Sequence, residues 1–107
     1  MTVPYSAGVS SPDQVAREPA DRHEVTVLVR YFAAARAATS VDEELIRLPA
    51  DATVADAVNT LRTRHPERLP RILDAASYLL DGVAVRDDST RLADGTEMDV
   101  LPPFAGG

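Results

Sequence analysis

The stretch TVADAVNTLRTRHP, residues 53–66, has the clearest periodicity in this sequence of 107 residues. Val54, Val58 and Leu61 recur at helical spacing, so we predict a helix over Val54–His65 with this apolar stripe facing the core. Thr53 suits the N-cap, with Asp56 three residues later completing a variant of the capping box. His65 falls in the last turn, where it suits the negative end of the helix dipole, and the proline at 66 ends the helix.

Period-two patterns that are typical of strands lie on both sides of this helix. Asp81-Gly82 and Asp94-Gly95 are tight-turn sequences, and the first of them separates two short apolar segments. Short helical pieces are expected over Ala33–Ala38 and Glu67–Leu73. The predicted strands begin at Glu24 with alternating Val25, Val27 and Val29, and continue with Glu43–Leu48 (stopped by Pro49), Ser77–Leu80, Val83–Val85 and Glu97–Leu101.

This order of elements predicts an α+β fold of the β-grasp, or ubiquitin-like, kind. A mixed sheet packs one face on a single main helix, because a sheet must bury its apolar face. We expect one domain over residues 24–101 and a flexible C-terminal tail over residues 102–107. Residues 1–23 contain three prolines, three serines and one glycine that break any period, and their apolar residues are sparse, so we predict a disordered extension there.

The composition excludes several classes of function. The chain has no cysteine and two histidines, which removes disulfides and thiolate chemistry, and no spacing suggests a metal site. The net charge of −6 argues against nucleic acid; it either keeps the chain soluble or steers it to a basic partner. No apolar run is long enough to span a membrane and no secretory signal is recognised, so we expect a cytoplasmic protein. All 11 basic residues are arginine, so there is no side-chain amine for a Schiff base or for attachment of a second copy.

The last six residues have a composition that suits entry into another protein. Pro102 and Pro103 end the final strand and begin a stiff, extended segment, because proline fixes φ and lacks an N–H. Six extended residues reach about 20 Å at roughly 3.3–3.6 Å each. Phe104 is the large apolar side chain expected to anchor the tail, and the glycines leave the Gly107 carboxylate unhindered. Two terminal glycines arise by chance in about 0.5 % of chains, since glycine is about 7 % of residues.

Four segments make the chain resemble a family of small sulfur carriers, which includes the small subunit of molybdopterin synthase and the thiamine-pathway sulfur carrier. The resemblance covers Val25 to Gly107 and is most specific at the Pro-Pro-x-x-Gly-Gly ending; the extension before Glu24 inherits nothing from it. The four segments are Arg30–Arg36, Asp81-Gly82-Val83, Leu92–Gly95 and Leu101–Gly107.

The resemblance implies a mechanism in which this chain has no catalytic residue and binds no cofactor. A ubiquitin-activating-type adenylating enzyme would use ATP to convert the Gly107 carboxylate into an acyl adenylate. Sulfur would displace AMP and leave a thiocarboxylate, that is, a 1-thioglycine at the C-terminus. The large, catalytic synthase subunit, in a heterotetramer, would then transfer the sulfur to cyclic pyranopterin monophosphate.

The resemblance also implies which surfaces meet the partners. Residues Pro102, Pro103, Phe104, Ala105 and Gly106 would lie in a partner channel. Phe32, Val83 and Leu101 match an apolar docking patch on the open sheet face, and Arg36 matches a family arginine. For Val83, ordinary core packing is an equal alternative. For Arg36, a solvated position in a turn is an equal alternative.

Three other functions stay open on the sequence alone. The same tail chemistry would serve sulfur delivery for cysteine or thiamine biosynthesis, with only the partner differing. A diglycine end also permits a ubiquitin-like modifier that is joined to lysines of other proteins. The third possibility is an interaction module with an inert tail, which the rarity of a terminal diglycine disfavours.

Overall fold

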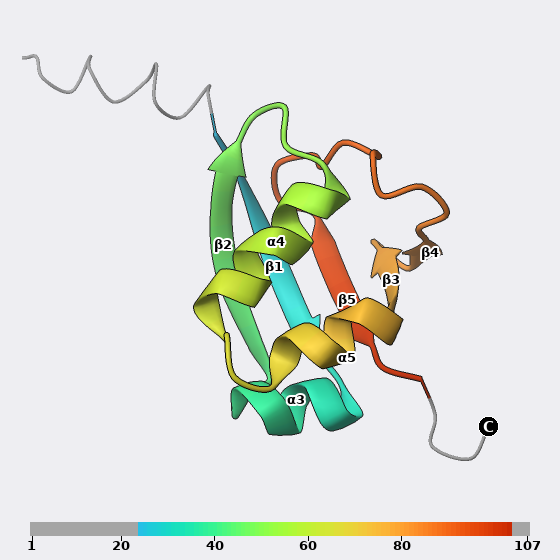
Figure 1. Ribbon diagram of the computed structural model, residues 1–107. Coiled ribbons are helices and arrows are strands. Elements are labelled where there is room, and N and C mark those ends of the chain that lie inside the picture. The colour runs from blue at the N-terminus through green and yellow to red at the C-terminus, as the bar shows by residue number, and fades with distance from the viewer. Residues whose placement is uncertain (1–23, 104–107) are drawn as a thin grey trace, which may run out of the picture.

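Figure 1 shows the computed structural model, which describes residues 24–103. The predicted disordered extension and residues Phe104 to Gly107 lie outside this part of the chain. The elements are β1 (Glu24–Tyr31), α3 (Ala33–Thr39), β2 (Glu43–Pro49), α4 (Val54–Arg64), α5 (Leu69–Ala75), β3 (Ser77–Leu80), β4 (Val83–Ala84) and β5 (Glu97–Leu101).

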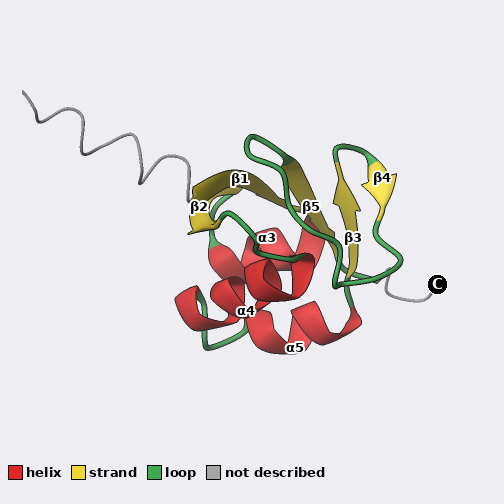
Figure 2. Cartoon of the chain, turned by 90° about the horizontal axis from the view of Figure 1, so that it is seen from above, coloured by secondary structure: helices red, strands yellow, loops and turns green. Residues whose placement is uncertain are grey.

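The strands form one five-stranded sheet in the order β2-β1-β5-β3-β4. The central pair, β1 and β5, is parallel, and the other neighbours are antiparallel. All three helices of the described residues lie on one side of the sheet, and the other face carries none of them, as the view from above shows (Figure 2). The predicted α+β class with a mixed sheet is confirmed.

Alternation along β1 places its apolar residues on the helix side. Val27 and Val29 are fully buried, whereas Leu28 and Arg30 point to the open face. The α4 stripe meets these valines: Val54 and Leu61 are fully buried, and Val58 packs against the same core. The predicted core face of the helix is therefore the observed one.

The helix α4 begins as predicted, with a complete capping box. Thr53 Oγ1 accepts from the Asp56 N–H at 3.3 Å, and Asp56 Oδ2 accepts from the Thr53 N–H at 2.9 Å. The N–H groups of Val54 and Ala55 donate to the carbonyls of Thr90 and Asp88, both at 2.9 Å. The loop before β5 thus completes the cap that the capping box begins.

Several predicted boundaries were wrong. The two short predicted helices, α3 and α5, cover the sheet together with the main helix α4, and α3 ends at Thr39, one residue later than predicted. Helix α4 ends at Arg64, with His65 as its C-cap, and α5 begins two residues later than predicted, with Pro70 in its first turn, where a missing N–H costs nothing. Strand β4 ends at Ala84, one residue before the predicted end.

β2 extends one residue beyond its predicted end and includes Pro49 as its last residue. Proline is tolerated there because β2 is an edge strand and the backbone nitrogen of Pro49 faces away from β1. The Leu45 carbonyl accepts from Arg64 Nη1 at 3.2 Å, and the opposite residue Leu28 donates its N–H to Thr96, so Leu45 turns its backbone groups away from β1. Pro49, four residues later, shares that orientation, and its missing N–H removes no ladder bond.

Two tight turns place β5, the strand that leads into the tail. Gly82 and Gly95 have φ of 84° and 83°, as the Asp-Gly sequences predict. The Gly95 N–H donates to the Thr26 carbonyl at 2.8 Å, and Asp94 Oδ1 accepts from the Thr26 N–H at 2.7 Å. These bonds fix the start of β5 against β1. No helix among the described residues has the length and apolar character needed to cross a membrane.

Candidate functional site at the base of the C-terminal tail

The parallel pairing of β1 with β5 brings Phe32 beside the base of the tail. Tyr31 pairs with Val100, so the next residues, Phe32 and Leu101, leave the sheet at the same end. Leu101 also pairs with Ser77 on β3. Together these segments surround a largely apolar cavity of 660 Å³, which we call the tail-base cavity; it is lined by Phe32, Ala33, Ala34, Ser77, Leu101, Pro102 and Pro103.

The structure brings some of the sequence-predicted site residues together. Phe32, Leu101, Pro102 and Pro103 all line the tail-base cavity. Phe32 and Leu101 are half-buried, and Pro103 is exposed. The remaining predicted tail residues, 104–107, lie outside the described part of the chain, so their roles stay predictions.

Val83 and Arg36 lie apart from this cavity. Val83 pairs with Leu80, and the Leu80 side chain packs against the core. Val83 lines a separate cavity of 350 Å³. It is 69 % exposed, so core packing is not its role. Arg36 is an exposed residue of α3 that faces Asp42 at 3.8 Å. A role in partner docking stays a prediction for both residues.

Arg30 links the polar and apolar parts of the open face. Its Nε lies 3.2 Å from Asp99 Oδ1, and its Nη1 lies 3.3 Å from Glu97 Oε1. The Asp99 Oδ1 atom is buried and has no aligned hydrogen bond, so its contact with Arg30 is an ion pair only. The same guanidinium lies 5.5 Å from the centre of the Phe32 ring, a cation–π distance. Arg30 therefore holds Phe32 at the rim of the cavity.

Ala33, between Phe32 and Ala34 in the cavity wall, has φ of 51°. This is the left-handed region, which costs a residue with a Cβ about 1–2 kcal/mol. Such strain is concentrated at functional sites. The backbone at this end of the sheet is thus bent sharply from β1 into α3, and the bend forms one wall of the cavity.

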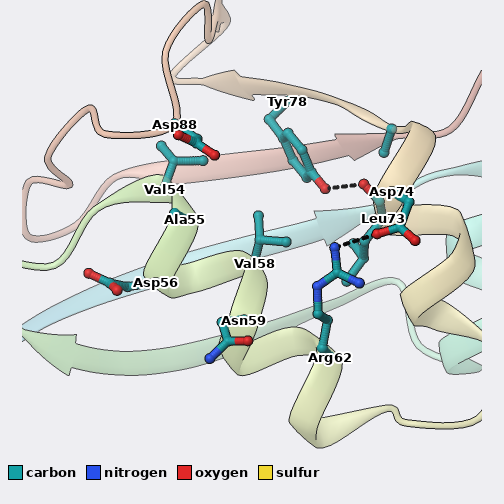
Figure 3. Close-up of a pocket in the computed structure, with 11 residues that line it drawn as sticks. Val54, Ala55, Asp56, Val58, Asn59, Arg62, Leu73, Asp74, Tyr78 and Asp88 are labelled. Carbon is teal, nitrogen blue, oxygen red and sulfur yellow. Dashed lines mark hydrogen bonds and ion pairs between the residues drawn. The ribbon is translucent and has the colours of Figure 1, made fainter.

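A second, more polar cavity of 560 Å³ lies on the helix side of the sheet (Figure 3). Two of its charged groups form an ion pair, with Arg62 Nη2 2.5 Å from Asp74 Oδ1. The Tyr78 hydroxyl donates to the Leu73 carbonyl at 2.8 Å. Burial raises the pKa of Tyr78 to about 12. These groups hold α4, α5 and β3 together, and none of the residues that line this cavity places a nucleophile beside a base.

The remaining polar cluster joins β1, β2 and the end of α4. The Glu44 carboxylate accepts from Tyr31 Oη and Arg64 Nη1, and lies 2.6 Å from His65 Nε2. Burial, with the hydrogen bond to Glu44, raises the pKa of Tyr31 well above its usual range. His65 thus caps α4 and also ties it to β2. Among residues 24–103 no group of three or more histidine, aspartate or glutamate side chains is placed to hold a metal ion.

Sequence reasoning missed three residues of the cavity wall: Ala33, Ala34 and Ser77. The two alanines were interpreted as helix formers and as part of the Arg30–Arg36 segment, and Ser77 as the start of a strand. Ser77 lies beside Leu101 because of the register between β3 and β5, and the alanines because of the register between β1 and β5; local periodicity predicts neither register. The parity of β5, with Asp99 and Leu101 on one face, was the available sequence signal for the open-face part of the site.

A mixed five-stranded sheet with its helices packed on one face defines a ubiquitin-like β-grasp domain. Residues 29–107 match the model of the ThiS family, and the chain belongs to this family. It is similar to a molybdopterin synthase sulfur carrier subunit of Chlamydomonas reinhardtii, with 30 % identity over 76 % of this chain and 98 % of the relative.

Solved structures agree with this assignment. One, described as a molybdopterin converting factor subunit 1 from Pyrococcus furiosus, is 33 % identical with a TM-score of 0.68 over 75 % of this chain and 99 % of that one. SAMP1 from Haloferax volcanii is 26 % identical with a TM-score of 0.69 over 77 % of this chain and 99 % of that one. Both similarities confirm the β-grasp fold.

Proposed function

We propose that this chain is the sulfur-carrier subunit of a molybdopterin synthase, with the carboxylate of Gly107 as the sulfur-accepting group. The observation that supports this best is the tail-base cavity. In a chain of the ThiS family, it sets an apolar docking region directly beside the strand from which the diglycine tail leaves. The name of the Chlamydomonas relative supports the choice of molybdopterin synthase.

The proposed chemistry takes place on the terminal carboxylate. An adenylating partner transfers AMP from ATP to a Gly107 oxygen and releases pyrophosphate. A sulfur nucleophile then attacks the acyl carbon and expels AMP, so that C–S replaces C–O and a thiocarboxylate remains. This sulfur bonds to cyclic pyranopterin monophosphate, and water then cleaves its bond to the Gly107 carbonyl carbon and restores the carboxylate. Two such transfers form the dithiolene. Because adenylation consumes ATP, we place this step in the cytoplasm.

The chain acts in this scheme as a carried substrate, and its partners supply the catalysis. The described residues support this division, because the carboxylates of Glu44, Asp74 and Asp99 pair with arginines inside the domain. The docking partners we propose are the large synthase subunit, in a heterotetramer, and a ubiquitin-activating-type adenylating enzyme. Phe32, Val83, Leu101 and Arg36 are the proposed contacts, and the tail enters the partner's channel.

Intact mass tests the proposal directly. Incubation with the cognate adenylating enzyme, ATP and a sulfur donor should replace one C-terminal oxygen by sulfur, which mass spectrometry and fragmentation of the tail would locate at Gly107. An unchanged mass, with an adenylating enzyme shown to be active on another carrier, would rule out the sulfur-carrier role.

Deletion of Gly107 should abolish sulfur transfer and leave the thermal unfolding of the domain unchanged, since the tail follows the last strand. Deletion of residues 1–23 is the matched control and should leave sulfur transfer intact. Molybdopterin formation by the chain that lacks Gly107 would contradict the mechanism.

One observation supports a second candidate, a ubiquitin-like modifier. SAMP1, whose name stands for small archaeal modifier protein 1, shares the fold at 26 % identity. Pull-down with tagged chain separates the functions: covalent adducts on lysines of other proteins would indicate a modifier, and capture of the large synthase subunit would indicate the proposed carrier. Capture of a cysteine synthase or of a thiamine-pathway enzyme would assign the carrier to another sulfur pathway.

A further inference from the structure

The tail-base cavity opens at the point where the tail begins. Two of the residues that line it are Pro102 and Pro103, and Phe104 is the next residue in the sequence. The rest of the wall is Phe32, two alanines, Ser77 and Leu101, and no charged side chain lines it. An apolar surface of this kind, left open to water, is stabilised when an apolar side chain covers it.

A polyproline II path through the two prolines would direct Phe104 towards the same cavity. Proline fixes φ near −65°, so Pro102-Pro103 favours a polyproline II segment, which has about three residues per turn. Residues three apart on such a segment share one side. Leu101 and Phe104 are three apart, and the Leu101 side chain lines the cavity. On such a polyproline II path the Phe104 ring would project to the cavity side of the tail.

We propose that, in the free protein, the Phe104 ring occupies the tail-base cavity and holds the tail against its own domain until a partner displaces it. This inference rests on the proposed function and adds a regulatory contact to it. The Phe32 ring offers an aromatic neighbour, and aromatic pairs gain from edge-to-face contact. Arg30, 5.5 Å from the Phe32 ring centre, fixes that neighbour in place.

The contact restrains the tail but does not cover its reactive end. Three residues follow Phe104, and in extended form they place the Gly107 carboxylate about 10 Å beyond it. A partner that uses the cavity region for docking must first release the ring. If nine molecules in ten hold the ring in the cavity, the apparent dissociation constant of that partner rises about tenfold. Release of Phe104 then frees it to serve as the anchor in the partner.

The composition allows a direct test with the free protein. The chain has two phenylalanines, Phe32 and Phe104, and both belong to the proposed contact. Labelling with 4-fluorophenylalanine therefore gives two fluorine NMR signals, and the peptide Pro-Pro-fluoroPhe-Ala-Gly-Gly gives the reference for an uncovered ring. We expect the Phe104 signal to differ from the peptide signal and to respond less to exchange of H₂O for D₂O. We expect Phe104→Ala to shift the Phe32 signal.

Matched variants on α3 locate the contact. Ala34 lines the cavity and Ala37 does not, and both are exposed. Ala34→Glu should move the Phe104 signal to the peptide position, whereas Ala37→Glu should leave it unchanged. Ser77→Glu, on the opposite wall, is the second variant and should act as Ala34→Glu does.

Four results would overturn the proposal. The first two are a Phe104 signal identical to that of the peptide and a Phe32 signal that Phe104→Ala leaves in place. The third is signals that change with dilution, which would assign the cavity to a second copy, and the fourth is a shift of the Phe104 signal after deletion of residues 1–23, which would assign the cavity to the extension. The fluorine NMR experiment contains no partner and no ATP, so its result does not depend on whether the thiocarboxylation assay succeeds.

Discussion

Glu44 shows how one residue can link three elements of this fold. Its carboxylate, on β2, receives hydrogen bonds from Tyr31 on β1 and Arg64 on α4, and it contacts His65. Burial by itself raises the pKa of Glu44, but the hydrogen bonds from Tyr31, His65 and Arg64 outweigh it and hold the pKa below the ordinary value of 4.5. The folded state thus favours the ionised carboxylate.

This lowered pKa makes stability depend on pH in a defined direction. A carboxyl whose pKa is lower in the folded than in the unfolded chain stabilises the fold above its unfolded pKa, and that contribution is lost as the pH falls through the folded pKa. We expect Glu44→Gln to lower the free energy of unfolding at pH 7 by about 2 kcal/mol, because it leaves hydrogen-bond partners of the carboxylate unsatisfied. As the pH falls below 4.5, we expect the variant to lose less stability than the wild-type protein loses.

Urea denaturation at pH 7 and over the range below 4.5 measures both effects of Glu44→Gln. The exposed neighbour Glu43 is the control, because Glu43→Gln removes the same charge without the network. Equal pH profiles for Glu44→Gln and Glu43→Gln would show that the network does not hold the Glu44 pKa down.

At the scale of elements, α4 depends on its first turn. Thr53 and Asp56 satisfy each other's backbone N–H groups, and the loop before β5 satisfies the next two donors. Thr53→Ala should lower the free energy of unfolding by about 1 kcal/mol, which corresponds to a melting temperature lower by about 4–8 °C for a domain of this size.

Thermal unfolding followed by circular dichroism measures this loss. Thr53→Ser keeps the accepting oxygen and should retain most of the stability. A Thr53→Ala variant as stable as wild type would mean that the carbonyls of Thr90 and Asp88 suffice to cap α4.

The sequence predicted the elements that local patterns determine and missed the features that depend on contacts with distant segments. The alternation of β1 and the stripe of α4 are properties of short windows, and both were correct. β2 was expected to end at Leu48, but it includes Pro49 as its last residue, because β2 is an edge strand and the N–H that proline lacks would face outward. An edge position is a property of the whole sheet order.

The candidate site shows the same division. The tail was recognised from its own residues, and the strand parity of Phe32 and Leu101 placed both on one face. The cavity between them depends on Ser77, and its place beside Leu101 follows from pairing across 24 residues of sequence, which no local pattern specifies. Val83 was grouped with Phe32 and Leu101, but its pairing with Leu80 places it at another cavity.

At the scale of the molecule, the sheet order separates two leucines of the open face. Leu101, on β5, lines the tail-base cavity, whereas Leu45, on the edge strand β2, is 61 % exposed and lies two strands away. If partners dock around the tail base, Leu101→Ala should weaken binding to the large synthase subunit by about tenfold, since a contact at the centre of an interface contributes more than about 1 kcal/mol.

Leu45→Ala removes the same atoms from the same face and should leave that affinity unchanged. Isothermal titration calorimetry with the purified large subunit measures both, and thermal unfolding of each variant separates lost binding from lost folding. If the two substitutions weaken binding equally, the interface spreads over the whole open face, and the tail base is not its centre. If neither substitution weakens binding, the partner binds the tail alone, because a leucine at the base of the tail would then contribute no more to docking than a leucine at the far edge of the sheet.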